Sequence, residues 1–264
     1  MRFLATFTYH QALSCLFPGA IFLILATSEM ITIPGLYRYD FIFLLCILVQ
    51  VLMITSKMET WDEVKVILLF HIIGLALELF KVQMGSWSYP EEAWSKIGGV
   101  PLYSGFMYAS VASYLCQAWR RLHVDLHQWP FQMSTWLLGA AIYVNFFTHH
   151  FFYDLRWVLI LWLLWHFRHT WVFFKVNDQK WRLPLTISFL LIGFFVWIAE
   201  NIATFFGAWQ YPHQEQGWSI VELGKISSWA LLVIISFLIV AQLKFVKKSH
   251  YTSSPSVDET QHTI

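Results

Sequence analysis

Charge is what this chain has least of. Charged residues make up 12% of its 264 residues, about half of what a water-soluble domain of this size carries. Hydrophobic residues make up 58%, and they include 24 Phe, 15 Trp and 11 Tyr. The formal net charge of +1 gives no indication of binding to nucleic acid. Long apolar runs recur between short polar turns, which favours a multi-pass membrane protein over a soluble all-helical one.

Cysteine and the common nucleotide or hydrolase motifs are scarce or absent. Cys15, Cys46 and Cys116 lie singly in apolar runs without C-x-x-C spacing, so we interpret them as small core residues rather than a disulfide or metal framework. No G-x-S-x-G elbow, phosphate-binding loop or dinucleotide fingerprint occurs, and we expect no cofactor. The first apolar run has a weakly charged start and no small-residue cleavage site, which predicts an uncleaved first span.

The apolar runs predict an all-α membrane bundle of about eight transmembrane helices, since a crossing helix needs about 20 apolar residues. Breakers such as Pro90, Pro130 and Pro184 separate the runs. Residues 1–246 form one transmembrane domain in this interpretation, and the polar, Ser/Thr-rich tail at 247–264 is expected to be a disordered cytoplasmic segment. The expected spans are 12–28, 39–55, 64–84, 100–119, 131–150, 155–175, 184–207 and 223–245.

The distribution of Lys and Arg predicts the orientation. Twelve of them fall at one set of helix ends and loops, against five at the other. The side richer in Lys and Arg is normally cytoplasmic, so we expect a cell-membrane protein with both termini in the cytoplasm. The five at the expected outer ends are Arg38, Lys81, Lys96, Arg156 and Lys225.

One short phrase occurs twice. Glu78 precedes the run Gly85–Pro90, and Glu200 precedes the run Gly207–Pro212, with Gly-x-Trp-x-Tyr-Pro in both. Matched positions are offset by 122 residues, close to half the chain. The offset lays spans one to four over spans five to eight and predicts two parallel four-helix repeats, about 1–122 and 123–246.

Glu78 and Glu200 are the candidate catalytic residues. Each lies about 10 Å below its helix end, seven residues from the glycine, where a carboxylate facing lipid costs about 2–3 kcal/mol or more. Both are therefore expected to point inward. As functional groups they would line an outward-facing cavity and donate protons. As structural groups they would tie helices together, with Lys81 pairing to Glu78 one turn away.

The aromatic residues of the two phrases are candidate ligand-binding residues. Trp87, Tyr89, Trp209 and Tyr211 lie where an interfacial aromatic belt is expected, and a belt combined with a chain turn explains their residue types. It leaves unexplained why the same spacing to Glu and Gly occurs in both halves. Asn201 lies beside Glu200 and is a further candidate contact.

A second polar cluster ends the fifth span. Asn145 and His149 share a helical face and lie at the expected level of the glutamates, next to His150, Asp154 and Arg156. His and carboxylate groups can together bind a metal, but other intramembrane histidines are poorly placed to join them. A hydrogen-bonded cluster in which Asn145 and His149 contact a ligand is the better interpretation.

Four segments together resemble the YoaT-like bacterial membrane proteins: Glu78 to Pro90, Ile97 to Tyr108, Asn145 to His150, and Ala199 to Pro212. The resemblance spans the third to the eighth predicted helix. It implies a bacterial plasma-membrane protein and names no reaction. The spacing of acid, seven residues and Gly-x-Trp-x-Tyr also looks like that of membrane lycopene cyclases and carotenoid hydratases. Those enzymes carry two adjacent glutamates after a downstream Pro, and this chain has Leu102-Tyr103 and Ile226-Ser227 there, which argues against cyclase chemistry.

Three functional hypotheses follow, and the residues do not separate an enzyme from the others. In the first, the protein binds or modifies an apolar, isoprenoid-like lipid, with membrane lipid and a small apolar ligand as partners. In the second, it is a small transporter or channel with the glutamates as proton or cation sites. In the third, it is a structural or assembly protein. The sequence does not specify an oligomeric state.

Overall fold

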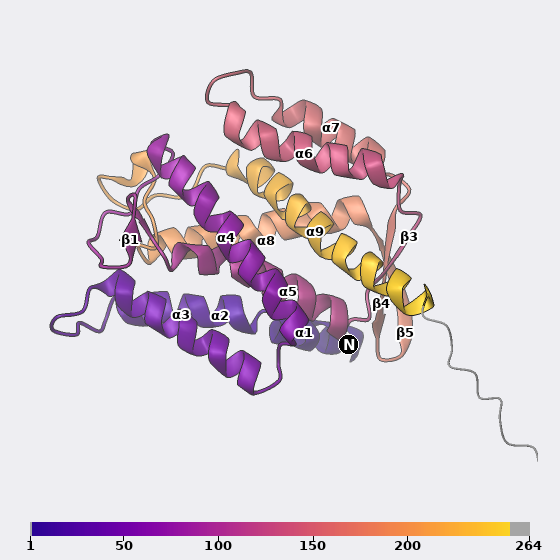
Figure 1. The fold of residues 1–264 in the computed structure, drawn as a ribbon, viewed down its shortest axis with the longest axis horizontal. Coiled ribbons are helices and arrows are strands. Elements are labelled where there is room, and N and C mark those ends of the chain that lie inside the picture. Colours follow the sequence, from indigo (N-terminus) through magenta and orange to yellow (C-terminus); the bar gives the residue numbers. More distant parts are fainter. Residues whose placement is uncertain (1, 254–264) are drawn as a thin grey trace, which may run out of the picture.

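The computed structural model describes the backbone of residues 2–253 and the side chains of residues 2–241 (Figure 1). This part of the chain is mostly helical. The helices are α1 (Arg2–Ser14), α2 (Leu16–Ser28), α3 (Arg38–Thr55), α4 (Trp61–Gln83), α5 (Ser104–Arg121), α6 (Gln132–Thr148), α7 (Arg156–His166), α8 (Leu185–Phe205) and α9 (Lys225–Ser253), with a 3₁₀ turn at Pro212–Gln214. The strands are β1 (Lys96–Ile97), β2 (Val100–Pro101), β3 (Asp125–His127), β4 (Trp171–Val176) and β5 (Gln179–Pro184).

Two helix pairs form the centre of the molecule. Helix α4 packs against α5 and α8 packs against α9, while α5 and α6 both contact α9. Figure 1 shows α2 and α3 on one side of this centre and the paired α6 and α7 on the other. The β1–β2 hairpin lies at one end of the molecule and the three-stranded sheet lies at the opposite end.

Each of the eight predicted segments contains a helix, but the sixth was predicted far too long. The segment 155–175 was expected to cross a membrane, and α7 ends at His166. The chain then forms β4, which pairs antiparallel with both β3 and β5. An all-α fold is therefore wrong in this region and at the short β1–β2 hairpin, although the rest of the predicted helical segments are right.

Local chemistry explains why the sixth helix stops. Strand β4 reads Trp-Val-Phe-Phe-Lys-Val, which is rich in β-branched and aromatic residues. Asn177 and Asp178 follow it with φ of 50° and 61°, the left-handed values that a two-residue hairpin turn requires. Val176 and Gln179 close that hairpin as partners. Apolar content alone predicted a helix here. The two turn residues instead favour a hairpin, so the apolar run before them forms a strand.

Fewer helices than expected are long and apolar enough to span a membrane. Within the described residues, α3 and α8 meet this condition, and α1 with α2 adds a third if the pair counts as one span broken by a 64° bend. The expected bundle of eight spanning helices is therefore reduced to two or three by length and composition. Helix α7 has 11 residues, about 16 Å at 1.5 Å per residue, roughly half of a bilayer core. Helix α4 carries Asp62, Glu63, Lys65, Glu78 and Lys81.

The predicted tail begins inside the last helix. Helix α9 continues to Ser253, so the first residues of the segment 247–264 are helical. Residues 254–264 lie outside the described part of the chain, and the expectation of a disordered cytoplasmic tail stays a prediction there.

Candidate functional site

Each of the two repeated phrases begins where a helix ends, and the two helices end in the same way. Helices α4 and α8 are each closed by a glycine in a left-handed conformation, with φ of 67° at Gly85 and 62° at Gly207. A residue with a side chain rarely adopts this φ, which is why glycine is usual at this position of a helix end. The backbone hydrogen bonds match at the 122-residue offset: Gly85 to Val82 and Ser86 to Lys81 in one copy, Gly207 to Thr204 and Ala208 to Ala203 in the other.

This turn directs the chain back along its own helix, so that the tyrosine reaches the acid eleven residues earlier. The Tyr89 hydroxyl donates to Glu78 Oε2 at 2.8 Å, and the Tyr211 hydroxyl donates to Glu200 Oε1. Both glutamates are 3% exposed, as the expectation of inward-facing acids required.

Glu78 accepts three hydrogen bonds from aromatic side chains. Besides Tyr89, Trp87 Nε1 donates to Oε2 at 2.7 Å and the Tyr108 hydroxyl on α5 donates to Oε1 at 2.7 Å. Both carboxylate oxygens are thus occupied without any basic partner, since no Lys or Arg of residues 2–241 forms an ion pair with Glu78. Hydrogen bonds to a buried carboxylate satisfy the group that burial would otherwise penalise.

Glu200 accepts hydrogen bonds from two aromatic donors, Tyr211 of its own phrase and a tryptophan of another helix. Its second donor is Trp229 Nε1 on α9, which bonds Oε2. Trp209, which occupies the position of Trp87 in the phrase, is buried and hydrogen-bonds Tyr211 instead of Glu200. In both sites the donors therefore come from the phrase itself and from the next helix, α5 for Glu78 and α9 for Glu200.

The two phrases pair with each other. Ser88 and Gln210 exchange backbone hydrogen bonds of 2.9 Å in each direction, an isolated antiparallel bridge. The rings of Trp87 and Tyr211 meet edge to face with centroids 6.0 Å apart. A continuous chain of contacts thus joins Glu78 to Glu200 through Trp87 and Tyr211. The sequence placed both acids at one level, and the pairing brings their aromatic donors together.

The expected pairing of Lys81 with Glu78 is wrong. Lys81 is 3% exposed, and its ammonium donates to the backbone carbonyl of Phe146 at 2.9 Å and contacts His150 Nε2 at 3.0 Å. It also lies 4.2 Å from the centre of the Phe146 ring. The last turn of α4 therefore faces the end of α6, while the Glu78 side chain is directed to α5 and the turning phrase.

Asn145 and His149 organise the turn between α6 and α7. Asn145 Oδ1 accepts from the backbone N–H of Leu155 at 3.0 Å, its amide nitrogen donates to Asp154 at 3.4 Å, and His149 Nδ1 lies 3.1 Å from the Asn145 carbonyl. Asp154 is in turn paired with Arg156 at 2.9 Å. Among the side chains of residues 2–241, no three His, Cys, Asp or Glu groups are placed to hold a metal ion. The geometry corresponds to a hydrogen-bonded cluster.

Asn201 is directed away from Glu200. Its side-chain amide donates to the Trp197 carbonyl at 2.8 Å, and its oxygen accepts from the backbone N–H of Val221 at 2.9 Å. Asn145 and Asn201 therefore have the same structural role, because the side-chain oxygen of each binds a backbone N–H of the segment that leads into the following helix.

A small apolar crevice of about 30 Å³ lies beside the Glu78 site. It is bounded by α4, α5, α6 and α9, and Tyr108, the donor to Glu78, forms part of its wall. The Tyr108 ring lies against Gly74, where an added Cβ would come within 2.5 Å of it. We call this space the α4–α9 crevice, and its lining residues are Phe70, Ile73, Gly74, Leu77, Tyr108, Tyr143, Leu232, Ile235, Ser236 and Ile239.

Comparison with known proteins assigns the chain. Residues 3–237 match the family model described as "Protein of unknown function (DUF817)". The chain belongs to this family. It is also 62% identical over 254 residues to the protein of Bacillus subtilis (strain 168) described as "Uncharacterized protein YoaT", covering 96% of each chain. The resemblance to YoaT-like proteins is thereby confirmed. No solved structure matches.

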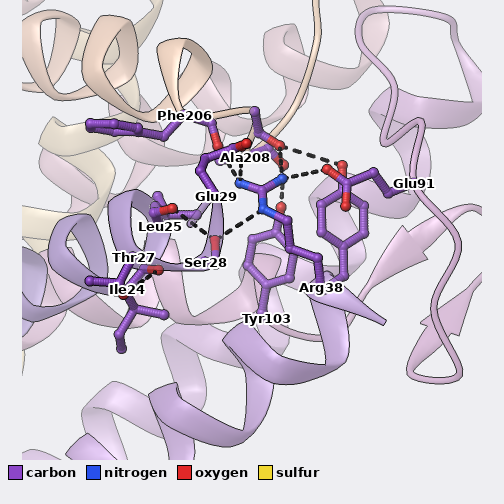
Figure 2. A network of polar contacts seen from close by, with 12 residues as sticks. Ile24, Leu25, Thr27, Ser28, Glu29, Arg38, Glu91, Tyr103, Phe206 and Ala208 are labelled. Carbon is purple, nitrogen blue, oxygen red and sulfur yellow. Dashed lines mark hydrogen bonds and ion pairs between the residues drawn. The ribbon is translucent and has the colours of Figure 1, made fainter. Parts of the chain in front are cut away.

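Sequence reasoning did not identify the network around Arg38 (Figure 2). Arg38 begins α3, and its guanidinium pairs with Glu91 and, at 2.7 Å, with Glu29. It also donates to the carbonyls of Phe206 and Gly207 at the end of α8. A cation at these last carbonyls is favourable because they carry the negative end of the helix dipole. The Tyr103 hydroxyl binds the next carbonyl, that of Ala208.

A third buried acid of the DUF817 protein lies toward the other end of the molecule. Glu59 is 3% exposed, and it accepts hydrogen bonds of 2.5 Å from Ser113 and from Gln50. Burial raises the pKa of Glu59, an effect that these two hydrogen bonds oppose. Sequence reasoning missed it because Glu59 lies in a short polar loop, where a glutamate is normally exposed.

Proposed function

We propose that this protein is a multi-pass membrane protein that binds the chain of an amphiphilic lipid along the surface of the α4–α9 crevice. The crevice itself is the observation that carries the proposal. Its walls are almost wholly apolar, and its polar groups are the Tyr108 and Tyr143 hydroxyls and Ser236. Binding sites for small apolar ligands typically have this character, with few polar groups that orient the ligand.

The outer surface supports a membrane location. Helices α6, α7 and α8 carry many large apolar side chains that remain exposed, far beyond what a soluble monomer normally displays. Together with α3 and α8, which are apolar and long enough to cross a bilayer, this surface favours a lipid environment. The exposed residues include Trp136, Leu137, Val144, Trp157, Val158, Leu161, Leu190, Phe194 and Phe195.

Two similar half-bundles are part of the proposal. The matching glycine turns, the tyrosine-to-glutamate bonds eleven residues apart and the equivalent pairs α4–α5 and α8–α9 support a duplication at the 122-residue offset. In this arrangement both termini are cytoplasmic, and the paired phrases lie toward the outer face.

The environment of Glu78 and Glu200 favours a structural role over acid–base chemistry. A general acid or base must reach the proton of a bound substrate, and these carboxylates are already bonded to buried indole and phenol groups. We assign them to holding the returning phrase and the next helix together. Asn145, His149 and Asn201 hold turns in the same way.

Lipid retention tests the proposal. The protein is purified in mild detergent, its bound lipid is extracted, and the ratio of lipid to protein is measured by mass spectrometry, with the absorption spectrum read for a polyene. Ser236→Phe, which adds a ring inside the crevice, should lower retained lipid about tenfold, because a filled site leaves no room for an acyl or isoprenoid chain.

Leu190→Phe on α8 is the matched control, since Leu190 is exposed and does not line the crevice. It should retain as much lipid as the unmodified protein. Equal retention in the unmodified protein and in Ser236→Phe would contradict lipid binding in the crevice and leave the scaffold hypothesis.

A further inference from the structure

Four basic or imidazole side chains gather where the crevice meets one end of the molecule. Lys81 ends α4, His150 lies in the α6–α7 turn, Arg156 begins α7 and Lys225 begins α9. Lys81 touches His150, and Arg156 contacts the Gly224 carbonyl and the Ser227 hydroxyl at 3.3 Å, beside Lys225. The charges of Lys225 and Arg156 both act on the Lys81 ammonium.

Among the described residues, two of the cations in this cluster lack a direct ion pair. Asp154 neutralises Arg156 at 2.9 Å, whereas neither Lys81 nor Lys225 forms an ion pair with a carboxylate in the described part of the chain. The charges of Glu200 and Glu222 act on Lys225 from a distance, and the Glu200 oxygens are already occupied by Tyr211 and Trp229.

Lys81 has donor capacity left over. An ammonium group has three N–H donors, and the carbonyl of Phe146 and His150 Nε2 provide two acceptors. Burial, followed by the charges of Lys81, His149 and Lys225, lowers the pKa of His150 to about 4, so His150 is neutral near pH 7 and adds no charge. A buried ammonium without a counter-charge is costly, which an anion at this place would relieve.

The lysines continue the two apolar stripes that line the crevice. On α4 the lining residues Phe70, Ile73, Gly74 and Leu77 lead to Lys81 by steps of one to four residues. On α9, Lys225 precedes Leu232 by seven residues, or two helical turns, and the lining residues Ile235, Ser236 and Ile239 follow further along the helix. Residues three, four or seven apart lie on one helical face, so both lysines are at the same end of the same groove.

From this geometry we propose that Lys81 and Lys225 bind the anionic, phosphate-class headgroup of a membrane lipid whose chain lies along the α4–α9 crevice. The inference rests on the proposed function and adds the headgroup class to it. The first peptide N–H groups of α9 add a further favourable field for a negative charge. A lipid without an anionic headgroup would leave the two ammonium groups without a direct ion pair.

The test compares two lipids in the full-length protein. Mixed micelles containing equal amounts of phosphatidylglycerol and phosphatidylcholine are equilibrated with the purified protein, and retained lipid is measured by native mass spectrometry. The unmodified protein should prefer phosphatidylglycerol about tenfold, the worth of one or two charge-assisted hydrogen bonds. Lys225→Gln and Lys81→Gln should each abolish most of this preference while keeping total lipid.

Lys65→Gln is the control, because Lys65 is a highly exposed lysine of α4 paired with Asp62, and it should leave the preference unchanged. Lys225, being less buried than Lys81, keeps the test decisive if Lys81→Gln fails to fold. Lipid retained without headgroup preference would overturn this inference and leave the proposed function intact, whereas no retained lipid of either kind would count against both. Binding of inorganic phosphate in place of phosphatidylglycerol would identify a free anion and overturn the lipid assignment.

Discussion

At the scale of single residues, the two glutamates show how a carboxylate can be buried without a cation. Glu78 has three aromatic donors and Glu200 has two. Each donor comes from an indole or phenol, whose apolar body adds buried surface while its N–H or O–H satisfies the acid. The carboxylate with more donors should therefore contribute more to the free energy of unfolding.

Replacing Glu78 by glutamine should destabilise the protein. The amide retains one acceptor oxygen and turns an N–H₂ group toward a former donor, which costs about 1–3 kcal/mol for a buried unsatisfied group. Glu200→Gln should cost less, because the carboxylate charge supports two hydrogen bonds there and three at Glu78. Thermal unfolding in detergent, followed by tryptophan fluorescence, measures both.

Glu222→Gln provides the comparison, since Glu222 is exposed and should shift the unfolding temperature little. A larger loss in Glu200→Gln than in Glu78→Gln would show that the number of donors does not govern the stability of these sites.

At the scale of elements, close helix packing depends on small residues. Gly74 on α4 touches the Tyr108 ring on α5, and Gly193 on α8 touches Ala230 on α9, where an added Cβ would lie 2.8 Å from the alanine side chain. Tyr108 is a donor to Glu78, and the neighbour of Ala230, Trp229, is a donor to Glu200. In both helix pairs a glycine contact is therefore adjacent to the hydrogen bond that holds the acid.

Gly74→Ala should destabilise the protein by about 1–3 kcal/mol, the usual cost of overpacking a core. The new methyl group must displace the Tyr108 ring from Glu78. Gly19→Ala offers the opposite case, since nothing lies within 4 Å of its added Cβ and alanine is favoured over glycine in a helix by about 0.5–1 kcal/mol. Unfolding temperatures of the two variants in one detergent should move in opposite directions, and a stabilised Gly74→Ala would contradict the packing shown here.

At the scale of the whole molecule, the two ends differ in chemistry. The paired phrases, the Arg38 network and the lysine cluster lie at the end with the β1–β2 hairpin, and the three-stranded sheet lies at the other end (Figure 1). The proposed orientation places the first end outside the cell and the second in the cytoplasm.

Cysteine labelling tests this orientation. In a Cys15→Ser background, Glu92→Cys should react with a membrane-impermeant maleimide in intact cells, while Gln179→Cys should react only after the membrane is permeabilised. Both positions are exposed, and Cys46 and Cys116 are buried. Equal labelling of the two cysteines in intact cells would contradict a membrane between the two ends.

Local patterns in the sequence were sufficient for much of the architecture. Apolar runs and their breakers located a helix in each of eight segments, and the spacing of Glu, Gly and Tyr identified the two acids and the turns that return to them. These features depend on residues a few positions apart, where helical geometry and the conformational freedom of glycine determine the outcome. The signal of the Asn177–Asp178 turn was also local. The apolar run before it was interpreted as part of a helix, so the strand was missed.

Only the tertiary structure decided which side chains meet. The carbonyls that Arg38 binds are 168 and 169 residues away. Lys81 binds a carbonyl 65 residues away rather than the acid one turn before it. Trp229 supplies to Glu200 the indole N–H that Trp87 supplies to Glu78. Such choices depend on how helices approach and rotate, and many different packings satisfy the same apolar pattern equally well. Spacing along the chain therefore located the polar groups, while helix packing selected their partners.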